Sequence, residues 1–551
     1  SFTKRLPVSK EIINVQKDLG AKNLGQDLPI LLKNQMSVIS TSDAGNGVGY
    51  TGFRIRGTAG SSINVMLNGV PYNDSESQGT YFVDVPDLAS SASQIVIQRG
   101  VGTSSNGVAS FGASVNILTK NPEEKAYFLT NQSYGSFNTH KHSFEVGTGK
   151  FLNNMLSISG RYSFVNSDGY IDRAFSKLNS YSINALFEKG NTKLRFLSFG
   201  GKEKTYQAWN GIDKATYEVN PTFNYSGAIY DANWNVVKYY NNETDNYWQK
   251  HYHLLWEQKL SDKWNLETTF HLTNGKGYYE NYKQDAAFGD YDLTNVIQNG
   301  NTITNTDFIR KKWLDNHFYG VVSNLYGNLE NLNLNFGLAA NQYFGKHFGN
   351  VSGVTYTNIF EHEYYRNNAL KNEVSGFAKA IYKRGQFEFF GDLQIRNIDY
   401  KTYVLKESAE DGADLKYNWL FFNPKAGINY KIDNGKVFFS YAHAHREPNR
   451  DDLISNANTK PEKLHDFEMG LEQTFGSVSF TANAYYMNYV NQLVLSGEIN
   501  NVGEFIKINS GKSYRLGIEL GALAKLSEKL NVSGNLTLSQ NKNRDFKIEG
   551  T

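Results

Sequence analysis

Apolar and polar residues alternate along most of the chain beyond about residue 123. In 156–164, Leu156, Ile158 and Phe164 share one face of an extended segment, while serine and arginine occupy the other face. Two more stretches repeat this pattern: 478–486 and 530–538. A period of two residues is typical of a strand with one apolar face. The sequence therefore predicts many β-strands of roughly ten residues.

Two classes of turn separate these strands. Short turns occupy 189–191, 261–263, 384–386, 433–435 and 527–529. Long polar segments lie near 204–246, 281–310, 343–370, 401–416, 446–462 and 490–512. Short turns at one end and long loops at the other are typical of outer-membrane β-barrels. A soluble sandwich also alternates, but it rarely extends as one domain over a length like 123–551.

The number of strands bears on whether the barrel is complete. We count about 17 barrel strands in 123–551. An odd number cannot close a ring in which every neighbour runs in the opposite direction. The sequence also ends without a terminal aromatic strand. We therefore expect several C-terminal strands to be missing from this sequence.

Residues 1–122 differ from the rest, because they are rich in glycine, serine and valine and carry only short strand signals. The change falls at 119–122, where Asn121 and Pro122 form a turn signal. We therefore predict two domains, an N-terminal mixed α/β domain over 1–122 and a barrel over 123–551.

Composition supports a membrane barrel. Aromatic residues make up 14% of the chain, with 36 Tyr and 35 Phe, and a barrel places such residues at its two interfacial girdles. No apolar run reaches the roughly 18 residues of a membrane-spanning helix. There is no cysteine, which suits an oxidising compartment. The N-terminus lacks a signal-peptide pattern, so we expect an export leader to have been removed.

The formal net charge of +2 gives no electrostatic reason to expect nucleic acid as a partner. No nucleophile, histidine and acid are grouped as a catalytic set would require. The sequence therefore predicts neither a nucleic-acid-binding protein nor an enzyme.

Three segments of the N-terminal domain each join a strand to a glycine turn. They are Gly52-Phe-Arg-Ile-Arg-Gly57, the run from Ile63 through Asn73 to Gly79, and the run from Ile95 through Gly102 to Lys120. In this order, and directly ahead of a large barrel, they resemble the plug of TonB-dependent outer-membrane receptors of the Bacteroidetes variety. Segments 440–448, 460–471 and 514–520 resemble barrel motifs of the same family.

The resemblance implies a plug inside an antiparallel barrel that has 22 strands in the family. It implies active import of a scarce nutrient across the bacterial outer membrane, with no cofactor. The implied partners are a small-molecule ligand, TonB with its inner-membrane energising complex, and the bilayer with its lipopolysaccharide. A surface lipoprotein is a further candidate partner. The family's TonB box has no clear position in this sequence.

The resemblance also implies a buried ionic latch between plug and barrel, formed by Arg56, Arg99, Glu468 and Glu519. Strand periodicity supports the direction of the two glutamates independently. Glu468 lies opposite the face of its apolar neighbours, and Glu519 does the same in its own strand. Because the apolar faces meet lipid, both glutamates should point into the lumen.

Ligand contacts are expected at the plug apex and in the outer loops. The apex candidates are Tyr72, Asn73, Asp74, Glu76, Ser77 and Gln78. The loop candidates are aromatic: Tyr206, Trp209, Trp234, Tyr279 and Tyr343. Aromatic rings suit stacking against siderophores, corrins, haem or sugars. The alternative is that many of these rings belong to the membrane girdles.

Two histidine pairs, His251 with His253 and His443 with His445, are spaced to share a strand face. Such a pair could hold a metal or haem iron. Haem receptors of the family usually carry a histidine in the segment that corresponds to 449–461, and here that segment has none. We therefore expect outward-facing or loop histidines and no metal site.

The predicted cargo is a ferric siderophore complex, with vitamin B12, haem, thiamine or another metal chelate as alternatives. From other classes of protein, an outer-membrane assembly or adhesion component remains open. So does a glycan importer that works with a surface lipoprotein, although such chains are usually longer.

Overall fold

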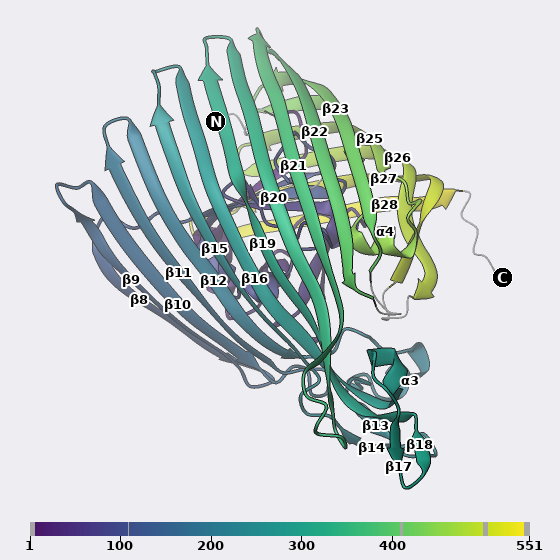
Figure 1. The fold of residues 1–551 in the computed structure, drawn as a ribbon. Coiled ribbons are helices and arrows are strands. Elements are labelled where there is room, and N and C mark those ends of the chain that lie inside the picture. The colour runs from purple at the N-terminus through teal and green to yellow at the C-terminus, as the bar shows by residue number, and fades with distance from the viewer. Residues whose placement is uncertain (1–5, 108–109, 408–411, 500–504, 545–551) are drawn as a thin grey trace.

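The computed structural model describes residues 6–107, 110–407, 412–499 and 505–544. Seventeen long strands form a barrel around an N-terminal domain (Figure 1). The barrel strands are β8 Ala126–Gly135, β9 Thr139–Phe151, β10 Leu156–Ser167, β11 Ser176–Lys189, β12 Thr192–Tyr206, β15 Thr244–Lys259, β16 Trp264–Ala287, β19 Asn305–Asn328, β20 Leu332–Gly353, β21 His362–Arg384, β22 Phe387–Lys406, β23 Leu415–Ile432, β24 Gly435–Arg446, β25 Glu462–Phe475, β26 Val478–Ile499, β27 Phe505–Lys525 and β28 Asn531–Arg544. The predicted fold class and the expected strand number are confirmed.

Each of these strands pairs antiparallel with the next, from β8 and β9 through to β27 and β28. The seventeen strands nevertheless form a closed barrel, in which β28 lies next to β8. Because seventeen is odd, β8 and β28 run in the same direction. Both strands are exposed over most of their length. The expectation of further C-terminal strands stays a prediction.

The lipid and lumen faces alternate as the sequence predicts. Met469 is 60% exposed and Ile518 51%, whereas Glu468 and Glu519 on the opposite faces are 4% and 0% exposed. Among the described helices, none has the length and apolar character that crossing a membrane would need.

The five short turns lie where they were predicted, for example between the end of β11 and the start of β12. The long segments are partly wrong, because several of their parts belong to strands rather than loops: 204–206, 244–246, 281–287, 305–310, 343–353, 362–370, 401–406, 490–499 and 505–512. Alternation with polar residues continues there, so neighbouring strands keep pairing. Parts of two predicted loops, 408–411 and 500–504, lie outside the described residues.

Small elements follow the long strands at the loop end (Figure 1). They are α3 Lys214–Val219, β13 Ala228–Tyr230, β14 Val236–Tyr239, η6 Phe288–Tyr291, β17 Val296–Gln298, β18 Asn301–Ile303 and α4 Arg450–Ser455. Most of them project beyond the barrel, whereas α4 packs inward, with Leu453 fully buried near Ala369 and Tyr400.

The N-terminal domain is built on a five-stranded sheet in the order β1-β6-β7-β4-β5, in which β4 and β7 are parallel. Its elements are β1 Lys10–Asn14, η2 Val15–Leu19, η3 Gly20–Lys22, α1 Leu28–Leu31, β2 Val38–Ser42, β3 Thr51–Ile55, η4 Gly60–Ser62, β4 Ile63–Leu67, β5 Val70–Pro71, η5 Phe82–Asp84, α2 Leu88–Ser91, β6 Ala92–Arg99 and β7 Ala113–Thr119. The apolar core of this domain extends onto Leu197 and Phe199 of β12, so the domain packs directly on the barrel wall. The proposed boundary at residue 122 falls between β7 and β8.

Gly201 of β12 lets the segment 82–86 approach the wall. A Cβ atom there would lie 2.3 Å from the Asp84 carbonyl oxygen and 2.7 Å from Pro86 Cδ. Gly201→Ala is therefore expected to displace this segment at a cost of about 1–3 kcal/mol. Hydrogen exchange of 82–86 should rise in this variant. It should stay unchanged in Gly391→Ala, where no atom lies within 4 Å of the added Cβ. Equal exchange in both variants would count against this contact.

Candidate functional site

The guanidinium of Arg56 joins the plug to two barrel strands. It follows β3 and forms an ion pair with Glu468 of β25 at 2.7 Å. It also makes two hydrogen bonds of 3.0 Å to Glu519 of β27. All three side chains are almost fully buried, and the guanidinium lies 4.0 Å from the ring centroid of Tyr485. The structure thus brings together three of the four predicted latch residues in one buried cluster.

Gly100 makes room for this cluster. Its φ is +69°, and a Cβ atom would lie 2.2 Å from a carboxylate oxygen of Asp466 and 2.4 Å from one of Glu468. The next residue, Val101, donates its backbone N–H to Asp466 at 2.8 Å. Only glycine combines that backbone conformation with so close an approach. The glycine of the Arg-Gly-Val-Gly run is therefore part of the contact between plug and barrel.

Arg99 lies at the edge of the cluster rather than at its centre. Its Nε atom is 3.5 Å from Glu519, whereas its Nη1 atom is 3.2 Å from Glu11 of β1. It also donates to Ser9 Oγ at 3.0 Å. The fourth predicted latch residue therefore serves mainly to hold the first segments of the plug.

A second anchor, which the sequence analysis missed, has the opposite polarity. Asp87 of the plug forms an ion pair of 2.6 Å with Lys141 of β9 and another of 3.1 Å with Arg161 of β10. Ser163 also donates to it at 2.7 Å. Burial raises the pKa of Asp87, but the attraction of Arg161 and Lys141 outweighs it, so the pKa is lowered overall. No local sequence pattern indicates this partnership, because Asp87 lies 54 and 74 residues before its two cationic partners, Lys141 and Arg161.

A third anchor lies at the plug apex, where Glu76 is 4% exposed. It accepts hydrogen bonds from Tyr343 at 2.9 Å and Tyr400 at 2.7 Å. His347 Nε2 lies 2.7 Å from the same carboxylate, and Arg450 of α4 lies 3.3 Å away. Glu76 is thus held by β20, β22 and the β24–β25 loop together.

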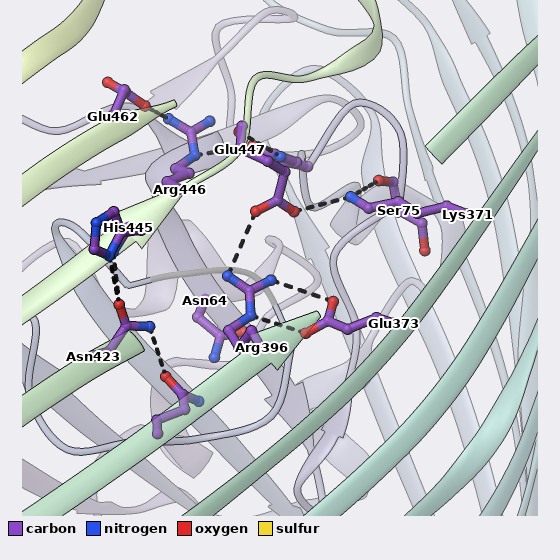
Figure 2. Close-up of polar contacts among 12 residues, drawn as sticks. Asn64, Ser75, Lys371, Glu373, Arg396, Asn423, His445, Arg446, Glu447 and Glu462 are labelled. Carbon is purple, nitrogen blue, oxygen red and sulfur yellow. Dashed lines mark hydrogen bonds and ion pairs between the residues drawn. The ribbon is translucent and has the colours of Figure 1, made fainter. Parts of the chain in front are cut away.

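The start of the β24–β25 loop fastens the apex further (Figure 2). Lys371 donates to the Ser75 carbonyl oxygen at 2.8 Å and to Glu447 at 3.0 Å. Arg396 forms ion pairs with Glu373 at 2.9 Å and with Glu447 at 3.5 Å. These four charges balance one another in a buried network. This loop therefore covers the apex instead of leaving it open.

The pH dependence of the apex contact follows from Glu76. Burial opposes its ionisation, but His347 and Arg450 outweigh burial and hold its pKa well below the usual range. The ionised carboxylate therefore stabilises the docked apex above the unfolded pKa of about 4.3. That contribution is lost as the pH falls below this value.

Hydrogen exchange of 73–79, corrected for intrinsic rates, is therefore expected to rise as the pH falls from about 6 to about 3. Glu76→Gln should flatten this dependence, since it removes the titrating group. Glu528→Gln, at an exposed turn, should keep the wild-type profile. A profile that is the same in all three proteins would refute the role given to Glu76.

The other apex candidates lie in the same contact and not on a free surface. Asn73 is 6% exposed and fixes its own loop through Ile63 and Gln78. Asp74 accepts from Ser77 within the loop, at 2.7 Å from its backbone N–H. Gln78 is fully buried and contacts Arg446 and the Glu447 carbonyl oxygen. Tyr72 is partly buried, 5.5 Å from the ring of His251.

Of the five aromatic candidates, the structure brings only Trp209 and Tyr279 together, with ring centroids 6.0 Å apart. Trp209 also meets Tyr50 of the plug at 5.8 Å, and Tyr50 meets Tyr81 at 6.4 Å. Trp209 is 39% exposed and Tyr81 42%. This aromatic rim, made of Tyr50, Tyr81, Trp209 and Tyr279, joins the plug to the barrel beside the outer loops.

The remaining aromatic candidates lie apart from this rim. Tyr206 is buried and donates to carbonyl oxygens of Ser226 and Tyr240 within the β12–β15 loop. Trp234 is 81% exposed at the β13–β14 turn. Tyr343 belongs to the Glu76 anchor.

The expected orientation of the first histidine pair is wrong. His251 and His253 are 4% and 1% exposed and face the lumen, because alternation along β15 places them opposite the lipid-facing residues. His251 stacks on Phe199 with ring centroids 4.4 Å apart. Within the described ranges, no three side chains of His, Cys, Asp or Glu converge as a metal ion would require.

Two protein-family models match the chain. The model described as TonB dependent receptor-like, beta-barrel, matches residues 195–551. The model described as TonB-dependent Receptor Plug Domain matches residues 4–114. A search of curated protein sequences found no match.

Solved structures share the fold. The ferric citrate transporter FecA in its unliganded form matches with a TM-score of 0.73 and 13% identity, over 98% of this chain and 79% of that one. The ferric-catecholate import receptor Fiu from E. coli K12 gives 0.70 and 14%, over 98% and 80%. The copper transporter OprC gives 0.75 and 13%, over 97% and 80%. At these identities the likeness concerns the fold alone.

Proposed function

Because the chain belongs to the TonB-dependent receptors of the outer membrane, we propose that it actively imports a ferric siderophore complex. The observation that carries this proposal is a folded plug held inside the barrel by buried charges on three sides. A passive pore has no use for such a plug. An importer needs a plug that keeps the barrel closed until the plug is displaced.

The three anchors explain how the plug stays in place without energy input. Arg56, Glu76 and Asp87 each hold the plug through hydrogen-bonded charges away from water. Such contacts are costly to break one partner at a time. In this proposal, TonB and its inner-membrane complex supply the force that breaks them after a ligand has bound.

The choice of an iron chelate rests on similar solved structures, which include a ferric citrate transporter and a ferric-catecholate import receptor. Vitamin B12, haem, thiamine and other metal chelates are the alternatives. The copper transporter among the similar structures shows that the fold also serves a different metal.

Mass spectrometry of small molecules that co-purify with the protein from iron-starved cells tests the cargo. The expected result is an iron complex of an organic chelator. An iron-free organic ligand such as a corrin would overturn the siderophore assignment and leave import standing. An adhesion or assembly component would show no loss of nutrient uptake when its gene is deleted.

A further inference from the structure

Beneath the aromatic rim, two barrel carboxylates face the lumen at the outer ends of their strands. Glu203 lies three residues before the end of β12, and Asp245 is the second residue of β15. The register pairs Thr205 with Asp245, so the two acids are diagonal neighbours on the same face. Glu203 is 0% exposed. The wall thus presents two carboxylates where the loop 207–243 begins.

The plug adds a tyrosine and a third carboxylate. The Tyr50 hydroxyl hydrogen-bonds to Asp245, and lies 3.2 Å from Glu203. Asp84 is carried onto β12 by the close approach at Gly201. The carboxylate of Asp84 has no hydrogen-bond partner among the described residues, although the residue is only 5% exposed. It lies close enough to Tyr50 and Asp245 for its charge to act on both.

The three acids share the lack of a cationic partner among the described residues. In the described part of the chain, none of Asp84, Glu203 and Asp245 forms an ion pair with Lys, Arg or His. Three other buried acids between plug and barrel behave differently, since Glu76, Asp87 and Glu468 each contact an arginine. Burying unpaired carboxylates is costly. The negative charge of these acids must therefore be neutralised by bound protons or by a cation from outside the protein.

The rim above the acids suits the same chemistry. Tyr279 is the direct cross-strand partner of Asp245, and Trp209 packs edge-on against both Tyr279 and Tyr50. Indole and phenol faces attract cations, with tryptophan the strongest of the aromatic residues. Carboxylates below exposed rings are a combination that recognises a flat or alkylated cation. An anionic chelate would meet like charges here.

We propose that Asp84, Glu203, Asp245 and the aromatic rim form a binding site for a positively charged ligand. This inference rests on the proposed function and narrows the choice of cargo. The imported chelate would carry a positively charged group, and that group would enter this site.

Protons take the place of the ligand when the site is empty. Burial raises the pKa of Asp84 well above its usual range, and the charges of Asp245 and Asp74 raise it further. The groups close enough to interact electrostatically with Asp84 are acids and phenols: Tyr50, Tyr72, Asp74, Tyr81, Glu203, Asp245 and Tyr247. A bound cation would lower the pKa of Asp84 and release a proton. Cation affinity should therefore rise with pH.

The test uses two flat probes of similar size and opposite charge, N-methylquinolinium and quinoline sulfonate. Tryptophan fluorescence of the purified full chain in detergent reports binding. The cation is expected to quench saturably and to bind at least about tenfold more tightly than the anion. Its affinity should increase as the pH rises and should fall as the salt concentration rises.

Variants locate the binding. Trp209→Phe should remove the saturable quenching and leave the fold intact, because the side chain is partly exposed. Glu203→Gln removes the negative charge at nearly constant side-chain size and should weaken cation binding about tenfold. Asp262→Asn removes the same charge at an exposed turn on the opposite end and should change nothing.

Equal or tighter binding of the anion would overturn the proposal. Cation binding that is unaffected by Glu203→Gln, or quenching that survives Trp209→Phe, would do the same. Failure of the proposed function is distinguishable, because it would appear as uptake independent of TonB while the charge preference of the site remained.

Discussion

Arg56→Ala is expected to weaken plug docking by about 3–5 kcal/mol, because it leaves Glu468 and Glu519 buried without their cation. The side chains of Glu468 and Glu519 point into the lumen and are only 4% and 0% exposed. Solvent therefore cannot replace the guanidinium as their partner. Hydrogen exchange of β2 and β3 in the purified full chain should speed up by two to three orders of magnitude or more, to the extent that the plug opens as a unit.

Two controls separate this effect from general damage. Arg54→Ala removes an exposed arginine from the same strand and should leave exchange unchanged. Arg56→Lys keeps the charge but loses the two-pronged contact with Glu519, so its effect should be intermediate. If Arg56→Ala behaved like Arg54→Ala, the arginine would not hold the plug.

Asp87→Ala should have an effect of similar size, about 3–5 kcal/mol, at the separate contact of the plug with β9 and β10. It leaves two cations, Lys141 and Arg161, without the carboxylate that both contact. Lys141 is 0% exposed. Exchange of α2 and the neighbouring segment 82–86 should increase more than that of β2 and β3.

The backbone at Asp87 needs its own control, because its φ is +57° and alanine tolerates that conformation poorly. Asp87→Asn keeps both the shape and the conformation and should lose most of the same stability through charge alone. Asp87→Gly removes the backbone strain at this φ and still leaves Lys141 and Arg161 without their carboxylate partner. If Asp87→Asn left exchange at the wild-type rate, the charge contact would contribute nothing.

The strands and short turns were predictable because they depend on local pattern. Alternation determines which face of a strand meets lipid. The apolar neighbours Phe467 and Ile518 mark the lipid faces of their strands, so Glu468 and Glu519 were predicted to point inward. Turn residues such as Asn434 and Gly435 mark the ends of strands directly. The barrel strands extend further at their outer ends than predicted. Beyond the membrane their residues are mostly polar, and such a pattern resembles the sequence of a loop.

The partners of the plug could be predicted only where a family motif named them. Arg56 was found in this way, whereas Asp87 and its partners Lys141 and Arg161 carry no pattern that links them. Glu76 was expected to touch a ligand, and that stays a prediction. Its contacts with the barrel were not expected, and they arise because the β24–β25 loop folds inward over it. Such contacts depend on tertiary packing, which no short segment encodes.

The candidate ligand site shows the same limit. Aromatic density in the β12–β15 loop indicated Trp209, but it indicated Tyr206 and Trp234 equally. What distinguishes Trp209 is the plug residue Tyr50 beside it, more than 150 positions away in the sequence. The acids beneath were not selected, because Asp84, Glu203 and Asp245 are ordinary polar positions until the fold brings them together.

Uptake of radioactive iron by intact cells tests the central claim most directly. The iron is supplied in spent medium from an iron-starved culture of the source organism, which contains its own chelators. The account predicts that deleting the gene lowers uptake, that restoring it recovers uptake, and that recovery fails when TonB is absent. Uptake that is equally restored without TonB, or that never depends on the gene, would contradict it.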